Sequence, residues 1–480
     1  MRFFVTLLLT GSIVFAQETT DEVTLLKEQI QMLQKQNQEQ QLHFARLYAM
    51  SFHQQALEYF RLKNYTKAIS SCEKALEHNP KHILSLECMG MSYIHLQDYE
   101  QATKHFRKIL NIEPDHSESL MHLGEVYFFQ KKYQQALEYF SKVLEFYPNR
   151  ELVYYNRALT YMKLGKNDLA HGDFSWIIKH NANSVAAYQN RGNIHWTKKQ
   201  YRESINDYTK AIELNRNKLF HNYYDLRGYE TSQQYDIILL QLHASYNNRS
   251  LCYESLKQYQ QAIDDLSQAI ALRPTHILAY RNRARNLMAL KKARLAAADL
   301  TKAIAIEKEV PYLYTARAKA YKDFLDLQFT TPPLSTSYEA NRAALNDYAS
   351  AINLNPNDYD AYTEKAFLHY EEDQFVSAAR CFTSAIRLKP QVVENYNNRG
   401  SCYYSLQKYE DAMNDYQKAL QLRPKFVLAH RNIARVYKRQ KKYRKAIEHW
   451  RILMDLKPSL KRELEDDIQD AERYLKENEK

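Results

Sequence analysis

A pattern of small and large apolar positions returns every 34 residues along most of this chain. Prolines mark the period in two series, Pro80, Pro114, Pro148 and Pro356, Pro390, Pro424, Pro458. When this proline is given position 32, eleven units begin at residues 49, 83, 117, 151, 185, 243, 277, 311, 359, 393 and 427. Self-similarity at such a period is typical of repeat architectures.

Within each unit the pattern predicts two helices. Positions 4, 8 and 11 fall on one stripe of a first helix, and positions 20, 24 and 27 on one stripe of a second. Position 8 is always Ala, Gly or Ser, and position 20 is Ala in ten units and Ser204 in the other. These small residues allow the two helices to approach closely, and the proline ends the second helix. We therefore expect an all-α chain of eleven antiparallel helix pairs.

The 34-residue pattern resembles the tetratricopeptide repeat family in eleven units that share one register. This resemblance implies a right-handed superhelix, an α-solenoid in which the first helix of each pair lines a concave groove. It also implies a scaffold that binds an extended peptide or partner segment in that groove. Exposed ends of a repeat array need caps, and amphipathic residues 459–480 are expected to form the C-terminal capping helix.

Two insertions divide the repeats. Residues 219–242 separate repeats 1–5, at 49–218, from repeats 6–11, at 243–458. This insertion contains an apolar run and is expected to be partly helical. The other, residues 325–338, interrupts repeat 8 and reads as a surface loop because it contains a proline pair. Each could be a binding loop or a tolerated bulge.

Residues 1–16 read as a signal peptide. Arg2 precedes an apolar run that ends in Val14-Phe15-Ala16, a pattern that a signal peptidase accepts. The run is too short to span a membrane, which takes roughly 20 apolar residues. We expect export to a bacterial periplasm or secretion, with a cytoplasmic location as the alternative.

Residues 17–48 differ from the repeats and are predicted to form a short helical arm. Val23, Leu26, Ile30 and Leu33 follow the 3-4-3 spacing of about two coiled-coil heptads, and Asn37 takes the next seam position. Homo-oligomerisation through residues 20–45 is the hypothesis that this pattern suggests.

Opposite charges occur together at two positions of six repeats. Position 7 is Arg and position 23 is Asp in the same six units, which pairs Arg157 with Asp173, Arg191 with Asp207, Arg249 with Asp265, Arg283 with Asp299, Arg317 with Asp347 and Arg399 with Asp415. A guanidinium suits a partly buried carboxylate, so we expect structural ion pairs. The Asp could belong to the same repeat or to its neighbour. Six ligand-binding arginines are the weaker alternative, because they would not each need a matched Asp.

A second polar position repeats in the first helices. Position 6 is predicted to face solvent, and it is Asn at Asn156, Asn190, Asn248, Asn282, Asn398 and Asn432, while Asn193 stands at position 9. An amide both donates and accepts hydrogen bonds, so this ladder suits an extended peptide backbone. Recent duplication of the units is the alternative explanation.

Basic residues concentrate in the last repeat. Arg435 and Arg439 are expected to face the groove within residues 431–451, and the whole chain has a formal net charge of +11. An RNA- or anionic-surface-binding protein is the alternative function that this cluster suggests, although nucleic acid is the less favoured partner. Pairing of the cluster with the acidic residues of the capping helix would explain it without a ligand.

No catalytic motif accompanies these features. The sequence lacks the phosphate-loop, dinucleotide, nucleophile-elbow and zinc-protease motifs. Five cysteines are present with no CxxC spacing, which indicates neither a disulfide framework nor a zinc site. We expect no enzyme activity, no cofactor, no metal site, and protein or peptide partners.

Overall fold

The fold is a series of paired helices, seen in a computed structural model that describes residues 2–224, 231–324 and 337–478. These residues divide into two compact units, residues 1–198 and 199–480. Within each unit, successive helices pack against one another. The predicted α-solenoid of helix pairs is therefore confirmed.

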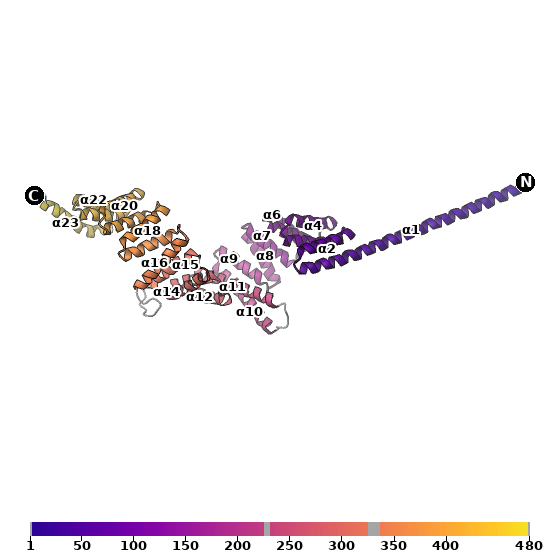
Figure 1. Cartoon of the computed structure of the whole chain (residues 1–480), viewed down its shortest axis with the longest axis horizontal. Coiled ribbons are helices and arrows are strands. Elements are labelled where there is room, and N and C mark those ends of the chain that lie inside the picture. The colour runs from indigo at the N-terminus through magenta and orange to yellow at the C-terminus, as the bar shows by residue number, and fades with distance from the viewer. Residues whose placement is uncertain (1, 225–230, 325–336, 479–480) are drawn as a thin grey trace. The chain divides into compact units, whose positions relative to one another are not determined.

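The first unit begins with one long helix, α1, and continues with shorter helices that pack in succession (Figure 1). Its helices are α1 Arg2–Arg61, α2 Tyr65–His78, α3 Ile83–His95, α4 Tyr99–Ile112, α5 Ser117–Phe129, α6 Tyr133–Phe146, α7 Glu151–Lys163, α8 Asn167–His180 and α9 Val185–Thr197.

The second unit continues the same alternation of first and second helices. Its elements are α10 Tyr201–Tyr224, α11 Thr231–Ser255, α12 Tyr259–Leu272, α13 Ile277–Ala289, α14 Ala293–Ile306, α15 Pro311–Phe324, α16 Ser337–Leu354, α17 Tyr359–Glu371, α18 Phe375–Leu388, α19 Val393–Ser405, α20 Tyr409–Leu422, α21 Val427–Arg439, α22 Tyr443–Leu456, the 3-10 turn Pro458–Leu460 and α23 Lys461–Asn478.

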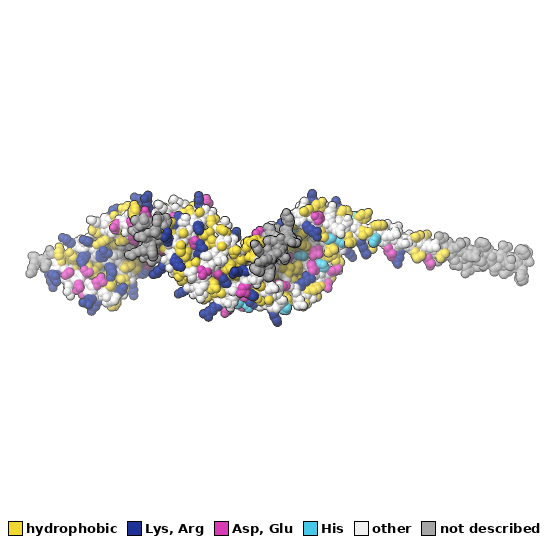
Figure 2. Space-filling view, turned by 90° about the horizontal axis from the view of Figure 1, so that it is seen from below, with side chains coloured by type: hydrophobic (Ala, Val, Ile, Leu, Met, Phe, Trp, Pro, Cys, Tyr) yellow, Lys and Arg dark blue, Asp and Glu magenta, His cyan; other side chains and the backbone are white. Residues whose placement is uncertain are grey.

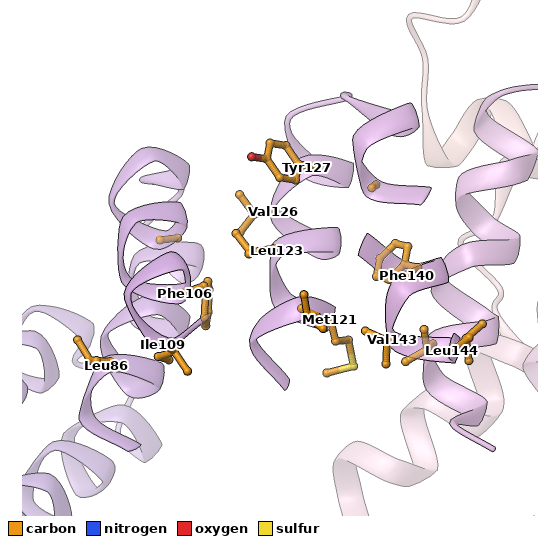
Figure 3. Packing of buried hydrophobic residues seen from close by; sticks show 14 residues of the cluster. Leu86, Phe106, Ile109, Met121, Leu123, Val126, Tyr127, Phe140, Val143 and Leu144 are labelled. Carbon is orange, nitrogen blue, oxygen red and sulfur yellow. The ribbon is translucent and has the colours of Figure 1, made fainter. Parts of the chain in front are cut away.

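Close packing inside each repeat follows from the small residue at position 8. A Cβ atom on Gly124 would lie 2.5 Å from the Phe140 ring, and one on Gly90 would lie 2.6 Å from the Phe106 ring. The aromatic ring at position 24 thus fills the space that the missing side chain leaves. Figure 3 shows Phe106 and Phe140 on either side of Met121 and Leu123 of α5, in one buried cluster.

The turn between the two helices of a repeat has one recurring backbone feature. Position 15 has a positive φ in ten repeats, and only Gly165 among these residues is a glycine. The other nine are Lys63, Gln97, Lys131, Lys199, Lys257, Lys291, Asp373, Gln407 and Lys441, with φ between 55° and 61°. A side chain in this left-handed region costs roughly 1 kcal/mol.

The structure refines the predicted boundaries. Helix α1 runs without interruption from Arg2 to Arg61, so the arm at residues 17–48 and the first helix of repeat 1 are one helix. The insertion at 219–242 lengthens α10 to Tyr224 and α11 from Thr231, with residues 225–230 outside the described part. Residues 325–336 of the other insertion also lie outside it.

The expected capping helix is α23. Leu464, Ile468 and Ala471 are buried on it and join a cluster with Ile447 and Trp450 of repeat 11. This helix therefore covers the last hydrophobic face of the array, as the amphipathic pattern predicted.

Candidate functional site

Five of the six predicted ion pairs are present, and each joins the two helices of one repeat. In repeat 7, Arg283 Nε donates to Asp299 Oδ2 at 2.7 Å and Arg283 Nη2 donates to Asp299 Oδ1 at 2.7 Å. The same two-bond arrangement pairs Arg157 with Asp173, Arg249 with Asp265, Arg317 with Asp347 and Arg399 with Asp415. The Asp thus belongs to the same repeat. The sixth predicted pair, Arg191 with Asp207, stays a prediction.

A third residue, missed in the sequence, ties five of these arginines to the preceding repeat: Arg191, Arg249, Arg283, Arg317 and Arg399. Arg283 Nη1 donates to Ser267 Oγ at 2.9 Å, and Arg249 Nη1 donates to Thr209 Oγ1 at 2.8 Å. The partner is always position 25 of the repeat before. The six repeats followed by a position-7 Arg all have Ser or Thr there, and the other five have Glu73, Arg107, Ala349, Gln417 and Arg451. The contact could have been predicted from this co-occurrence of Ser or Thr at position 25 with Arg at position 7 of the next repeat.

The arginine is also held between aromatic rings of its own helix. The Arg157 guanidinium lies 5.3 Å from the Tyr154 ring centre and 5.8 Å from that of Tyr161. Hydrogen bonds to Asp299 raise the pKa of Arg283 above its usual value, against burial, which lowers it. The guanidinium groups already contact a carboxylate and aromatic rings inside the repeat, which favours a structural role over ligand binding.

The asparagines at position 6 are less exposed than the predicted solvent-facing position implies. Asn282 is buried and the others are half-buried, as is Asn193. Three of them bond to the first helix of the preceding repeat. Asn156 Nδ2 donates to Glu125 Oε1 at 3.0 Å, Asn190 Nδ2 to the Tyr155 hydroxyl at 3.2 Å, and Asn432 Nδ2 to Asn397 Oδ1 at 3.0 Å.

The remaining asparagines contact a neighbour on their own helix. Asn248 Oδ1 accepts from Asn247 at 3.3 Å, and Asn398 Oδ1 accepts from Asn397 at 3.4 Å. Asn282 Oδ1 accepts from Arg281 Nη2 at 3.2 Å. Contact between successive first helices is the packing reason for Asn that the sequence pattern concealed. A peptide ladder over all six is still a prediction, and Asn156 lines a cavity.

That cavity, here called the repeat 2–4 pocket, lies across three first helices and has a volume of about 390 Å³. Its apolar walls come from α3, α5 and α7, with one ring contributed by α6. The lining residues are Met91, Ile94, His95, His122, Glu125, Phe128, Phe129, Phe140, Asn156 and Leu159. Those on first helices occupy positions 6, 9, 12 and 13 of successive repeats, and Phe140 is at position 24. Position 12 was not expected to face the groove.

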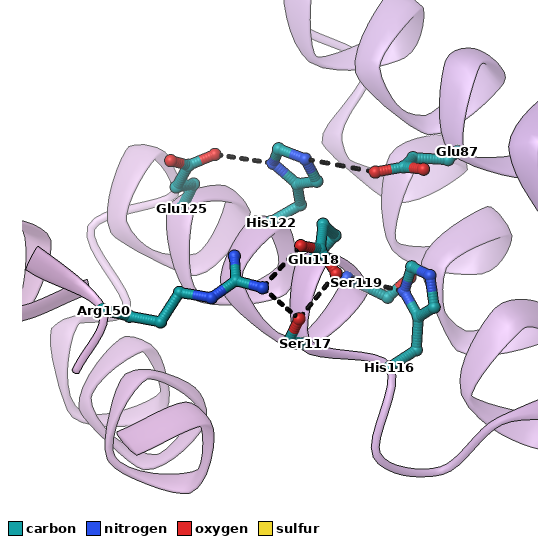
Figure 4. A network of polar contacts seen from close by, with 8 residues as sticks. All are labelled: Glu87, His116, Ser117, Glu118, Ser119, His122, Glu125 and Arg150. Carbon is teal, nitrogen blue, oxygen red and sulfur yellow. Dashed lines mark hydrogen bonds and ion pairs between the residues drawn. The ribbon is translucent and has the colours of Figure 1, made fainter. Parts of the chain in front are cut away.

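A polar row crosses this pocket from one repeat to the next. His122 Nδ1 lies 2.9 Å from Glu125 Oε2, and His122 Nε2 lies 3.9 Å from Glu87 Oε1. Figure 4 shows the His122 ring between these two carboxylates. Because Asn156 donates to the other oxygen of Glu125, the row links α3, α5 and α7. No Lys or Arg occurs among the described side chains that line the pocket.

A second cluster holds the start of α5. Arg150 Nη2 donates to Glu118 Oε1 at 2.8 Å and to Ser117 Oγ at 2.9 Å (Figure 4). Burial opposes ionisation, but hydrogen bonds from Ser117 and Arg150 lower the pKa of Glu118 to about 2. This ion pair fixes the turn between repeats 3 and 4, next to the pocket.

The basic cluster of repeat 11 is partly neutralised by the capping helix. Lys438 contacts Asp467, Arg431 lies 3.9 Å from Glu463, and Arg451 lies 3.4 Å from Glu472. Figure 2 shows Lys and Arg side chains intermixed with Asp and Glu at this end of the chain.

Arg435 and Arg439 are exposed and lie against the preceding repeat. The Arg435 guanidinium is 5.0 Å from the Tyr404 ring centre, and Arg439 Nε is 3.4 Å from the Tyr404 hydroxyl. Both therefore contact the first helix of the preceding repeat, and their role in a groove stays a prediction.

Other chemistry is sparse. In the part of the chain that the structure describes, no three His, Cys, Asp or Glu side chains are grouped to hold a metal ion. Burial raises the pKa of Cys252 to about 11 and that of Cys402 to about 12, which keeps these thiols protonated. Of the helices searched within the described ranges, none has the length and apolar character that crossing a membrane requires.

Several known proteins resemble this chain. A segment of 90 residues, 19% of this chain, is 30% identical to heat shock protein STI1 of Saccharomyces cerevisiae and spans 11% of that protein. A tetratricopeptide repeat protein from Parabacteroides merdae is 18% identical over 60% of this chain and 98% of its own, with a TM-score of 0.38. Yeast Tom70 is 16% identical over 89% of this chain and 96% of its own, with a TM-score of 0.32.

Family models match the repeats in the predicted register. Those described as tetratricopeptide repeat match residues 49–82, 81–149, 185–218 and 243–276, and one described as TPR repeat matches 400–441. Three of these matches, 49–82, 185–218 and 243–276, begin and end at the unit boundaries that the prolines define. On these matches and its paired helices, the chain is a tetratricopeptide repeat protein.

Proposed function

We propose that this protein is a scaffold that holds an extended partner segment in the repeat 2–4 pocket. The observation that carries this proposal is the pocket itself. Three successive first helices present apolar side chains around a row of polar groups. Concave, mostly apolar sites with a few placed polar groups are typical of binding sites.

The lining of the pocket defines the partner segment that we expect. An apolar side chain would be inserted between Phe129 and Leu159, since burial of such a side chain gives roughly 1.5–3 kcal/mol. Glu125 favours backbone N–H groups or a basic residue beside this apolar side chain. An acidic segment or a C-terminal carboxylate is disfavoured, because no described side chain of the lining is Lys or Arg.

A selection from a phage library of random peptides tests this proposal. Peptides enriched on the wild-type chain are expected to bind the Leu159→Lys variant at least about tenfold more weakly, a change of ~1.4 kcal/mol. Leu169→Lys on α8 is the matched control, because Leu169 is an exposed leucine outside the pocket. Peptides whose affinity is the same for both variants, or that are rich in Asp and Glu, would contradict the proposed site.

We also infer that the protein works outside the cytoplasm. The support is the basic and apolar pattern of residues 1–16. Mass spectrometry of the chain produced in a bacterial host with a periplasm is expected to find a mature form that starts at Gln17. A chain that keeps residues 1–16 in the cytoplasm would argue for the alternative location.

A further inference from the structure

The arm formed by α1 is a long helix with an uncovered apolar seam. Between Lys27 and Tyr48 the described side chains are exposed, except for half-buried Ala45. The helix projects beyond the rest of its unit, and Figure 2 shows hydrophobic side chains along its described part. Contact with the repeats begins near Tyr48, whose ring centre is 5.1 Å from that of His78.

The seam follows a heptad repeat for longer than the first four apolar residues indicate. Ile30 and Leu33 occupy one pair of seam positions, and Phe44 and Leu47 occupy another pair, two heptads later. The spacing 30, 33, 37, 40, 44, 47 alternates three and four residues throughout. All four apolar side chains are exposed by about half or more. This regular seam on a solvent-exposed helix is suited to another helix.

Asn37 and Gln40 fill the seam positions between these apolar pairs. An amide buried in a seam is destabilising unless a partner supplies both a donor and an acceptor. An identical helix, parallel and in register, places Asn37 against Asn37 and supplies both. Asn at such a position is known to fix register and to favour two strands. A parallel helix shifted by one heptad would set Asn37 against Ile30 or Phe44, and a fully overlapped antiparallel helix would set it against Gln40 and lose the Asn–Asn pair.

The flanking positions do not oppose self-association. The residues beside the seam are Lys27, Gln29, Gln34, Gln36, Gln41 and His43. Lys27 alone carries a full charge at neutral pH, so two parallel copies bring few like charges together. Leu25, Met32 and Leu42 lie off the seam.

We propose that two copies of this chain associate through a parallel, in-register coiled coil along residues 27–47. Asn37 and Gln40 set the register, and the apolar pairs on either side provide the association. Since each arm is continuous with the first helix of its own repeat 1, the dimer would hold two repeat arrays together.

Light scattering after gel filtration of the chain from Gln17 onward tests this proposal. Twice the chain mass is expected, and Leu33→Asp is expected to reduce it to the single chain mass. Met32→Asp is the matched control, since Met32 is 68% and Leu33 64% exposed but only Leu33 is in the seam. A monomeric wild type, a larger assembly, or equal effects of the two variants would overturn the assignment.

Disulfide trapping tests the register separately. Under a mild oxidant, Asn37→Cys is expected to form a covalent dimer, since two thiols at one level of the seam can join. Gln38→Cys, one position away, is expected to trap far less. A wild-type dimer in which Gln38→Cys traps as well as Asn37→Cys would overturn the parallel, in-register arrangement.

Discussion

Repeats 2–3 and repeats 6–7 have the same helix pairs but place their polar groups in opposite ways. In repeats 6–7 the charges lie inside, as the Arg249–Asp265 and Arg283–Asp299 pairs. In repeats 2–3 the same positions hold Met89 with His105 and Leu123 with Tyr139.

The faces that meet between neighbouring first helices differ as well. In repeats 6–7, Arg285 Nε lies 2.6 Å from Glu254 Oε1, and this ion pair occupies the positions that form the pocket wall in repeats 2–4. In repeats 3 and 4 the equivalent positions hold two apolar side chains, Phe128 and Leu159. The same backbone repeat therefore carries two arrangements of side chains. In repeats 6–7 ion pairs lie inside each repeat, and in repeats 2–4 apolar side chains line a pocket.

Breaking one interior ion pair should produce the largest effect on stability. Asp299→Ala leaves Arg283 buried without its carboxylate, and we expect a loss of about 3 kcal/mol. Because repeat arrays unfold segment by segment, hydrogen exchange of α13 and α14 is the suitable measurement.

The chain supplies the control for this variant. The double variant Arg283→Leu, Asp299→Tyr gives repeat 7 the residue types that repeat 3 has at these positions, Leu123 and Tyr139. Well-packed apolar residues often replace a buried ion pair without loss. The double variant should recover most of the protection of α13 and α14 from hydrogen exchange. A double variant that exchanges as fast as Asp299→Ala would show that the apolar pair does not replace the ion pair.

Acid should weaken repeat 2 through His105, which stands where repeat 7 has Asp299. Burial, followed by the charges of Lys108 and Lys104, lowers the pKa of His105 to about 4. An unfolded histidine titrates near 6.5, so below that pH the unfolded state binds the proton more tightly. Stability should therefore fall between pH 6.5 and 4, by at most about 3 kcal/mol.

His105→Phe keeps a ring beside Tyr93 and removes the titrating group, so it should flatten part of this pH dependence in hydrogen exchange of α3 and α4. His78→Phe, at an exposed histidine, serves as the control. Equal slopes for wild type and His105→Phe would show that the buried ring does not titrate as described.

The smallest effect should be the same in both regions. Lys131 and Lys291 have φ of 61° and 58° at position 15 of repeats 3 and 7. Glycine at either site removes a backbone strain of roughly 1 kcal/mol. It also raises the conformational entropy of the unfolded chain, which opposes this gain in stability. Chemical denaturation should show similar small shifts for Lys131→Gly and Lys291→Gly. Opposite shifts would mean that the two turns are not equivalent.

The sequence predicted the fold well because its signals are periodic. Proline at position 32 and small residues at positions 8 and 20 fix the helix pairs wherever they recur. The Arg and Asp at positions 7 and 23 were also predictable, because each occurs only with the other.

The site was less predictable because its signal is not periodic. Asn156 stood out through repetition, yet its partner Glu125 and the wall residue Phe129 occur at positions that change character from repeat to repeat. The role of Asn190 depends on a tyrosine hydroxyl 35 residues earlier. Such contacts between repeats become visible only when successive first helices are placed side by side.

Photocrosslinking at the pocket wall tests the central claim most directly. Phe129 and Phe146 are both 52% exposed, but only Phe129 lines the pocket. With a photoreactive phenylalanine analogue at either position, a peptide selected on the wild-type chain should crosslink at 129 and not at 146. Crosslinking at 146 alone, or equally at both, would contradict binding in the repeat 2–4 pocket.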